Sequence, residues 1–410
     1  MKNFFRQIPP AAYLVVLLLF STKGCTTRKH TIHSTYQNGV VVSAHPEASA
    51  VGLHILKQGG NAVDAAVAVQ FALAVVYPNA GNLGGGGFMV YRSAAGETTA
   101  LDFREKAPGA AARDMYLDAE GNPIRDLSLY GVLAAGVPGA VDGMVQAHGR
   151  YGSLPWSSLL EPAIRLAEQG FSLTKMQAWE LNRNKSFFEK LNPQGTALIG
   201  EGSWQKGDLL IQQELAGTLK RIRDQGRAGF YDGETAGHIV RTMQAGNGII
   251  SLEDLRAYRA VWRTPVTGSY RGYTVISMPP PSSGGVALIG LLQSVEAFPL
   301  QQWGFQQDST VRVMTEAARR IYADRATHLG DPDFYPVPIG ELTDSAYNAR
   351  RMDGLDFSRA TPSTAVSAGK PGHTEREETT HFSIVDKHGN AVSLTTTLNG
   401  SYGSGVVVAG

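Results

Sequence analysis

Apolar residues recur at helical spacing along much of the chain. The stretch from Pro46 to Gln58 has this spacing and stops at Gly59 and Gly60, which predicts a helix that ends there. The next stretch, from Ala62 to about Val76, follows the capping residue Asn61 and is apolar on nearly every side, so we expect a deeply buried helix. Further helices are expected at 137–149, 157–168, 286–295 and 310–326, and strands at 88–91 and 273–276.

A β-hairpin is predicted near the end of the sequence. Residues 380–386 alternate between apolar and polar, a short turn containing Gly389 follows, and residues 390–399 alternate again. With a three-residue loop and a left-handed Gly389, Thr379 lies directly opposite Thr397, and Asn399 points to the same face. A two-residue loop would place Thr379 opposite Leu398 instead, so the pairing depends on the loop length.

The first residues resemble an export signal. Lys2 and Arg6 precede an apolar run at 11–20 that is too short to cross a bilayer of about 30 Å as a helix. A basic start before a short apolar run is typical of a secretory signal, so residues 1–24 are predicted to be a signal peptide. We expect an exported protein, periplasmic or membrane-anchored in a bacterium. Cys25 follows in a context similar to a lipoprotein cleavage site, and both lipidation and ordinary cleavage remain open.

Composition excludes several kinds of partner. The chain has 410 residues, with 37 Lys and Arg against 36 Asp and Glu, so no basic field indicates a nucleic-acid partner. A single cysteine excludes an intrachain disulfide and a zinc site built on several thiolates. The histidines include no His-Glu-x-x-His pair, and Asp331-Pro332-Asp333 is typical of a turn, so we predict no metal and no cofactor.

Glycine is abundant, with 47 residues, and a cluster of it lies at 81–87. The residues after this cluster are Phe88 and Met89, where a phosphate-binding P-loop needs Lys and Ser or Thr. The cluster also follows a predicted helix and precedes a strand, the reverse of the order in a dinucleotide-binding motif. We therefore expect a tight connection in which backbones or a ligand approach closely.

The junction at Glu378 and Thr379 is a candidate site of chemistry. Residues 352–378 contain few large apolar side chains and are predicted to form a mobile linker, whereas strand alternation resumes at Thr379. A hydroxyl nucleophile needs a base, and if the chain is cut before Thr379, its own α-amine, with a pKa of about 8, can be that base. An ordinary threonine at the start of a strand is the alternative. His381 is favoured as an ordinary strand histidine over a general base.

Several motifs follow one another in a fixed order. They are GGNAVDAA at 59–66, GGGGFM at 84–89, DFREKAP at 102–108, PSSGG at 281–285, and YADR with GDPDF between 322 and 334. TTHFSIVD, GNAV and TTTLN follow between 379 and 399. In this order the motifs resemble the γ-glutamyltranspeptidase family over roughly residues 38–410, and the last group is similar to the start of the family's small subunit.

The resemblance implies a fold and a processing event. The fold is that of an N-terminal nucleophile hydrolase, an α+β protein built as a four-layer αββα sandwich. A single precursor would cut itself between Glu378 and Thr379 into a large and a small subunit. Residues 25–378 would then be the large-subunit region, with the linker at 352–378, and residues 379–410 the beginning of the small subunit.

The resemblance also implies roles for individual residues. Thr379 would attack the γ-amide of glutathione or another γ-glutamyl compound and pass the γ-glutamyl group to water or to the amine of an amino acid or peptide. Thr397 would hydrogen-bond the nucleophile, and Asn399 would contact the substrate's α-amino group. Arg104 would hold the α-carboxylate, which suits its planar group of donors.

Other interpretations remain open. Arg104 could form only a surface ion pair with Asp102 or Glu105. A related acylase of the glutaryl or cephalosporin type would use the same nucleophile on another amide, although Arg104 favours a γ-glutamyl substrate. An uncleaved, noncatalytic surface lipoprotein is a third possibility.

The resemblance departs from the family at the end of the sequence. Members continue beyond the part that matches 403–405 with further strands, an acidic residue that binds the α-amino group, and serine and glycine pairs that form the oxyanion hole. This sequence stops at Gly410, so we expect a core without its C-terminal strands, from an incomplete sequence or a degenerate gene product. Because oxyanion donors often contribute about 3 kcal/mol to catalysis, we expect these residues alone to be inactive.

Overall fold

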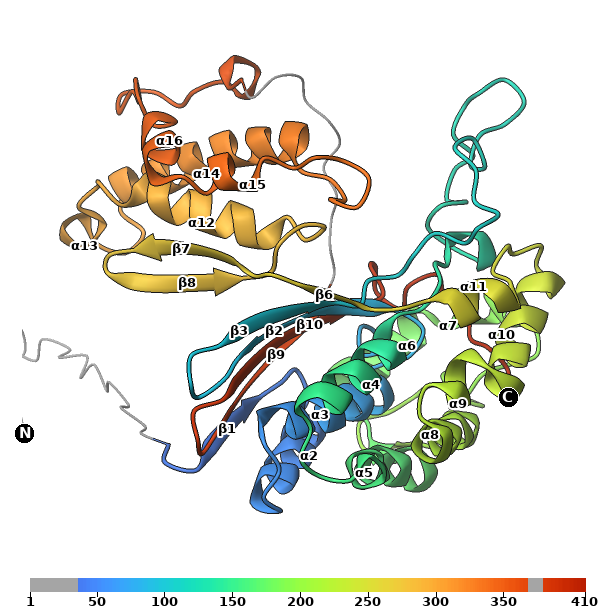
Figure 1. Ribbon diagram of the computed structural model, residues 1–410. Helices are drawn as coiled ribbons and strands as arrows, with labels where there is room; N and C mark the ends of the chain where they lie inside the picture. The colour runs from blue at the N-terminus through green and yellow to red at the C-terminus, as the bar shows by residue number, and fades with distance from the viewer. Residues whose placement is uncertain (1–35, 368–378) are drawn as a thin grey trace, which may run out of the picture. The chain divides into compact units, whose positions relative to one another are not determined.

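The computed structural model describes residues 36–367 and 379–410 (Figure 1). Residues 38–410 form one unit, which is distinct from residues 1–37. The predicted signal peptide at 1–24, Cys25, Glu378 and the part of the predicted linker at 368–378 lie outside the described residues.

A six-stranded antiparallel sheet organises the unit, in the order β1-β9-β10-β2-β3-β6. β9 and β10, which come from the end of the chain, lie between β1 and β2, which come from its beginning (Figure 1). The sheet is therefore complete only when the two ends of the sequence have paired. Its strands are β1 (Gly39–Val42), β2 (Gly86–Arg92), β3 (Thr98–Asp102), β6 (Val261–Arg263), β9 (Thr379–Asp386) and β10 (Ala391–Thr397).

The β9–β10 hairpin has the register that a three-residue loop predicts. The Asp386 N–H donates to the carbonyl of Asn390 at 3.0 Å, and Gly389 is left-handed with a φ of 88°. Thr379 therefore lies directly opposite Thr397, as predicted.

Helices cover one face of the sheet (Figure 1). α3 (Ala62–Val76) is buried along its whole length, as its sequence predicts, and contacts β9 and β10. α2 (Pro46–Lys57) packs against α3 and β1. Because strand side chains alternate between faces, every second residue of the hairpin joins the core beneath the sheet. These residues are Phe382, Ile384, Val392 and Leu394.

Asp386 connects the hairpin to the first turn of α3. Its Oδ2 accepts hydrogen bonds from the Ala62 N–H at 3.0 Å and from Asn390 Nδ2 at 2.7 Å. Its Oδ1 accepts from the N–H groups of His388 and Asn390. Burial favours the neutral acid, but these hydrogen bonds outweigh it and lower the pKa of Asp386. The charged carboxylate thus fixes the hairpin loop and the helix start together.

The remaining elements extend this core and build a second group of helices on a small hairpin. The helices and strands expected near 137–149, 157–168, 286–295, 310–326, 88–91 and 273–276 are all present. Around the main core lie η1 (Val132–Ala134), α4 (Ala140–Tyr151), α5 (Trp156–Gln169), β4 (Phe171–Ser172), α6 (Lys175–Arg183), α7 (Lys185–Leu191), β5 (Leu209–Leu210), α8 (Gln213–Gln225), α9 (Ala228–Tyr231), α10 (Gly233–Ala245) and α11 (Leu252–Ala257). The second group comprises β7 (Val266–Tyr270), β8 (Tyr273–Ser277), α12 (Gly284–Val295), α13 (Leu300–Trp303), α14 (Asp308–His328), α15 (Ile339–Leu342), α16 (Ser345–Arg350) and η2 (Ser363–Ala365).

The first part of the predicted linker packs against this second group. Met352 is buried in a cluster with Val313 and Ala317 of α14. Further along, the Thr361 N–H donates to Glu316 Oε1 at 2.9 Å. Met352 and Thr361 are thus in contact with α14, which the composition of the predicted linker did not indicate.

Replacing Asp386 with asparagine is expected to reduce the free energy of unfolding by about 2 kcal/mol at pH 7, because hydrogen bonds to a charged acceptor are weakened. A carboxyl group with a lowered pKa stabilises the fold above its unfolded pKa of about 3.9, and this stabilisation is lost as the pH falls through the folded pKa. The difference between the two proteins should therefore shrink below about pH 4. Urea unfolding at pH 7 and pH 3 measures it, with the exposed Asp114→Asn as the control. A difference that is unchanged at pH 3 would contradict this assignment.

Candidate active site

One end of the sheet brings together residues that are far apart in the sequence. β9 begins at Thr379, which lies opposite Thr397 at the end of β10, and Thr397 in turn lies opposite Gly86 at the start of β2. Gly87 and Phe103 exchange backbone hydrogen bonds, so Arg104 follows beside Gly86. Neighbouring strands lie about 4.8 Å apart, so the backbone positions of Thr379 and Arg104 are within about 15 Å of each other. The structure therefore places the predicted nucleophile, its partner and the predicted cation at the same end of the sheet.

Thr397 is almost fully buried, with 2% of its surface exposed. β10 ends at this residue, and Asn399 lies beyond it with a left-handed φ of 72°. The strand alternation that was expected to set the direction of Asn399 therefore does not reach it. Asn399 instead donates its backbone N–H to Thr397 Oγ1 at 2.8 Å.

Arg104 has both an ion pair and exposed surface. Its Nε lies 3.3 Å from Glu105 Oε2, and 31% of its side chain is exposed. Burial raises the pKa of Glu105, although the charge of Arg104 opposes this. Asp102, the other carboxylate considered as a partner, pairs with Arg263 at 2.8 Å instead. A guanidinium has five N–H donors, so one contact with Glu105 leaves others for a ligand.

The backbone of Arg104 is also held in place. Its N–H donates to Asp102 Oδ1 at 3.1 Å, and its carbonyl accepts from the Tyr258 hydroxyl at 2.6 Å. Tyr258 is buried and stacks on Tyr231. Tyr258 was not identified from the sequence, because it lies outside the motifs and far from Arg104 along the chain, whereas Glu105 was considered only as an ion-pair partner of Arg104.

The glycine cluster allows close contacts between backbones. A Cβ atom would lie 2.3 Å from the Thr397 carbonyl oxygen if added at Gly85, and 2.1 Å from the Thr395 carbonyl oxygen if added at Gly87. The Gly85 carbonyl also accepts the N–H groups of Gly139 and Ala140 at 2.8 and 3.0 Å. The prediction of a tight connection with close backbone approach is confirmed.

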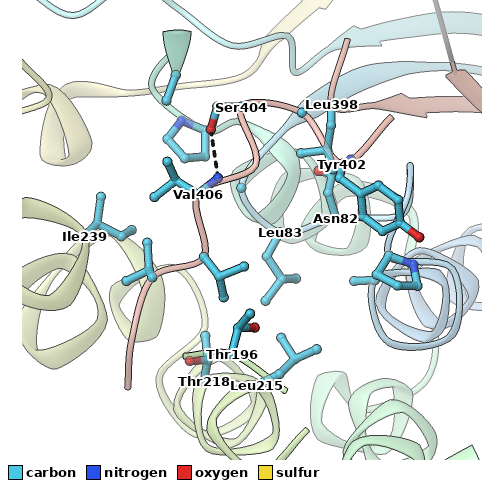
Figure 2. Close-up of a pocket in the computed structure, with 18 of the residues that line it drawn as sticks. Asn82, Leu83, Thr196, Leu215, Thr218, Ile239, Leu398, Tyr402, Ser404 and Val406 are labelled. Atoms are coloured by element: carbon cyan, nitrogen blue, oxygen red, sulfur yellow. Dashed lines mark hydrogen bonds between the residues drawn. The ribbon is translucent and has the colours of Figure 1, made fainter. Parts of the chain in front are cut away.

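A cavity of about 840 Å³ adjoins this end of the sheet (Figure 2). Its lining includes Gly84, Glu105 and Asn399. Of the predicted site residues that the structure describes, Asn399 is the one that lines it. The volume lies within the range of about 300 to 1,000 Å³ that is usual for ligand pockets.

His381 has the environment of an ordinary strand histidine. Its Nδ1 lies 2.8 Å from Thr395 Oγ1, and its Nε2 lies 3.2 Å from Ser383 Oγ and 3.3 Å from Ser393 Oγ. Partial desolvation lowers its pKa, which disfavours the charged form of the ring. These contacts are to hydroxyl groups rather than to a carboxylate that could orient a general base.

No group of three or more His, Cys, Asp or Glu side chains in 36–367 and 379–410 is arranged to hold a metal ion. In the same ranges, no helix combines the length and apolar character needed to cross a membrane.

Comparison with known sequences gives a match along most of the chain. The sequence model of the family described as gamma-glutamyltranspeptidase matches residues 48–410. A glutathione hydrolase proenzyme of Escherichia coli (strain K12) is 47% identical over 373 residues, which cover 90% of this chain and 64% of that protein. This chain therefore spans less than two thirds of the length of that relative. An acylase ACY 1 proenzyme of Pseudomonas sp. (strain SE83) is 38% identical, over 91% of this chain and 67% of that protein.

A solved structure is similar in fold. The crystal structure of Helicobacter pylori gamma-glutamyltranspeptidase matches with a TM-score of 0.80 and 45% identity, over 82% of this chain and 97% of that one. The helix-covered sheet and this match define the fold of an N-terminal nucleophile hydrolase. The chain belongs to the γ-glutamyltranspeptidase family.

Replacing Gly85 with alanine is expected to lower the free energy of unfolding by more than about 2 kcal/mol, because the new methyl group would overlap the Thr397 carbonyl oxygen. Gly84→Ala is the matched control, since nothing lies within 4 Å of a Cβ at that position. The control should change stability by less than about 1 kcal/mol. Denaturant unfolding measures both variants, and equal effects would show that the close approach at Gly85 is not as described.

Proposed function

We propose that the chain is the precursor of a γ-glutamyltranspeptidase, or glutathione hydrolase, that cuts itself before Thr379. Residues 25–378 supply the large-subunit region and residues 379–410 begin the small subunit. Family membership supports the activity, and the position of Thr379 at the first paired residue of β9 supports the site of cutting. Because the chain spans 64% of its Escherichia coli relative, its activity, substrates and partners all belong to this proposal.

The cut begins with the Thr379 hydroxyl. Its oxygen attacks the carbonyl carbon of Glu378, and the peptide C–N bond breaks, so the acyl group moves from nitrogen to oxygen. The Thr379 nitrogen leaves as a free α-amine. Water then hydrolyses the ester, which yields the Glu378 carboxylate and restores the Thr379 hydroxyl.

The transfer reaction uses the hydroxyl group of Thr379 and the α-amine that the cut has freed on the same residue. The α-amine of Thr379 accepts the hydroxyl proton while the oxygen attacks the γ-carbonyl carbon of glutathione or another γ-glutamyl compound. The amide C–N bond breaks, the leaving amine takes the proton, and a γ-glutamyl ester remains on Thr379. Water, or the amine of an amino acid or peptide, attacks this ester and frees the enzyme.

The observation that carries the proposal is the strand register. It places Thr379 opposite Thr397 and at the same end of the sheet as Arg104, which follows β3. In this arrangement Thr397 hydrogen-bonds the nucleophile, Arg104 binds the α-carboxylate of the γ-glutamyl group, and Asn399 contacts its α-amino group. The exposed part of the Arg104 side chain is consistent with a role in binding a carboxylate.

An acylase is the second candidate, because an acylase proenzyme is 38% identical to this chain. Glutaryl amides have the same carboxylate and reacting carbonyl as γ-glutamyl amides but lack the α-amino group. Asn399 is the residue assigned to that amino group, and its position on the cavity wall favours the γ-glutamyl substrate.

We also propose that the protein is exported, with residues 1–24 as the signal peptide, and is periplasmic or membrane-anchored. Basic residues before the apolar run at 11–20 support this proposal. Lipidation at Cys25 would provide a lipid anchor. The signal peptide and the lipid anchor would each place the enzyme outside the cytoplasm, where it meets extracellular γ-glutamyl compounds.

Intact-mass spectrometry of the purified full-length protein tests the nucleophile. The wild type is expected to yield two fragments, the second beginning at Thr379, because its hydroxyl performs the cut. Thr379→Ala should remain whole. Thr315→Ala, an exposed threonine on α14, should be cut like the wild type. An uncut wild type, or a Thr379→Ala variant that is cut equally, would overturn the proposal.

The binding role of Arg104 is tested by the affinity of the cut protein for γ-glutamyl-p-nitroanilide. This affinity is measured as Kd, or as KM where there is turnover. Arg104→Gln should weaken it about tenfold or more, because a charged hydrogen bond to the carboxylate is lost. Arg113→Gln, at a fully solvated arginine, should leave it unchanged. An unchanged value for Arg104→Gln would remove Arg104 from the site.

The same measurement with glutaryl-p-nitroanilide separates the two candidate functions. A γ-glutamyl enzyme should bind it more weakly than the γ-glutamyl compound, because the contact with the amino group is missing. Tighter binding of the glutaryl compound would favour the acylase.

A further inference from the structure

The side chain of Asn82 is buried at the end of the sheet and forms hydrogen bonds with both of its polar atoms. It has 4% of its surface exposed. Its Nδ2 donates to the carbonyl oxygen of Thr397 at 3.0 Å, to Thr396 Oγ1 at 3.0 Å and to the Ala80 carbonyl at 2.9 Å. Its Oδ1 accepts from the Gly85 N–H at 2.9 Å. The amide therefore connects the glycine cluster directly to the last two residues of β10.

This amide continues the strand ladder beyond its last backbone pair. β10 and β2 pair as far as Thr397 and Gly86. One residue further, Gly85 approaches the Thr397 carbonyl so closely that a Cβ there would lie 2.3 Å from it, yet its N–H donates to Asn82 rather than to Thr397. The Asn82 side chain thus bridges the Gly85 N–H and the Thr397 carbonyl. It accepts from the first and donates to the second, as a peptide group of a neighbouring strand would.

The Thr396 hydroxyl completes the connection. Its oxygen accepts from Asn82 Nδ2 and from Gln70 Nε2, which belongs to α3, at 3.0 and 3.1 Å. The same Gln70 nitrogen donates to the Asn82 backbone carbonyl at 3.1 Å. The end of β10 is therefore tied both to the glycine cluster and to the buried helix beneath the sheet. Figure 2 shows Asn82 on the cavity wall next to this strand end.

We infer that Asn82 is a positioning residue that fixes the end of β10, and with it Thr397, opposite the start of β9 for the cut before Thr379. This inference rests on the proposed function. Asn82 acts through the position of the Thr397 peptide, whose carbonyl accepts its hydrogen bond. An asparagine suits this position because its Nδ2 donates to the Thr397 carbonyl while its Oδ1 accepts from the Gly85 N–H.

Aspartate at this position would have the same shape but the wrong chemistry. It would keep an oxygen for the Gly85 N–H, whereas the atom that replaces Nδ2 could no longer donate to the Thr397 and Ala80 carbonyls. An ionised oxygen facing two carbonyl oxygens is repelled by them, so the end of β10 would move or loosen.

The test is the rate of cutting of the full chain, followed by intact-mass spectrometry. The cutting rate of Asn82→Asp should be lower than that of the wild type by about tenfold or more. The matched control is Asn348→Asp, another fully buried asparagine, whose Nδ2 donates to Gln293 Oε1 and to the carbonyls of Leu342 and Asp344. The control removes a comparable set of hydrogen bonds away from the sheet, so its cutting rate should match the wild type even if its stability falls.

A second pair of variants covers the case in which Asn82→Asp does not fold. Thr396→Val removes the hydroxyl that binds the Asn82 amide and should slow the cut, whereas Thr396→Ser keeps the hydroxyl and should be cut faster than Thr396→Val. Amide hydrogen exchange supplies a readout independent of cutting: the Gly85 N–H should be protected in the wild type and exchange faster in Thr396→Val.

The outcomes separate the inference from the proposed function. A wild type that is never cut overturns both. A wild type that is cut, with Asn82→Asp and Thr396→Val cut at the same rate, overturns the inference and leaves the proposed function standing. Slow cutting of both variants together with wild-type cutting of Asn348→Asp supports the inference.

Discussion

The pairing of β10 with β9 and with β2 is the constraint on which the rest of the structure depends. It sets Thr379, Thr397 and Gly86 in one row at the end of the sheet. A shift of one residue would turn the apolar side chains of both strands away from α3, because strand side chains alternate between faces. Burial of residues such as Phe382 and Leu394 therefore specifies the same register that assembles the candidate site.

The same pairing explains how a protein cut before Thr379 would stay in one piece. β9 pairs with β1 on one side and β10 on the other, and its last residue, Asp386, binds the start of α3. The cut would lie before the first paired residue, so it would break none of these hydrogen bonds. A new α-amine formed there would be held by the ladder rather than left on a free end. The cut and the transfer reaction would thus both use the start of β9, which its two neighbouring strands hold in place.

The sequence predicted the features that depend on local patterns. The apolar length of α3 was sufficient to predict the buried helix, and the turn at Gly389 predicted the hairpin, whose register the sequence left dependent on the loop length. The order of the strands was not predicted, because β1, β3 and β6 are short and the partner of β1 lies more than 300 residues away along the chain. The hydrogen bonds of Asn82 to Thr397 and of Tyr258 to Arg104 also join distant residues, so no local pattern reveals them. The motifs identified the candidate residues, whereas the fold was needed to show that they meet.

We propose that the register makes Thr379 a nucleophile directed at a γ-glutamyl group. The most direct test is to treat the cut protein with an electrophilic analogue of glutamine and to map the adduct by peptide mass spectrometry. We expect a single adduct on Thr379, formed more slowly when Arg104 is replaced by glutamine. An adduct on another residue, or none on the cut protein, would contradict it.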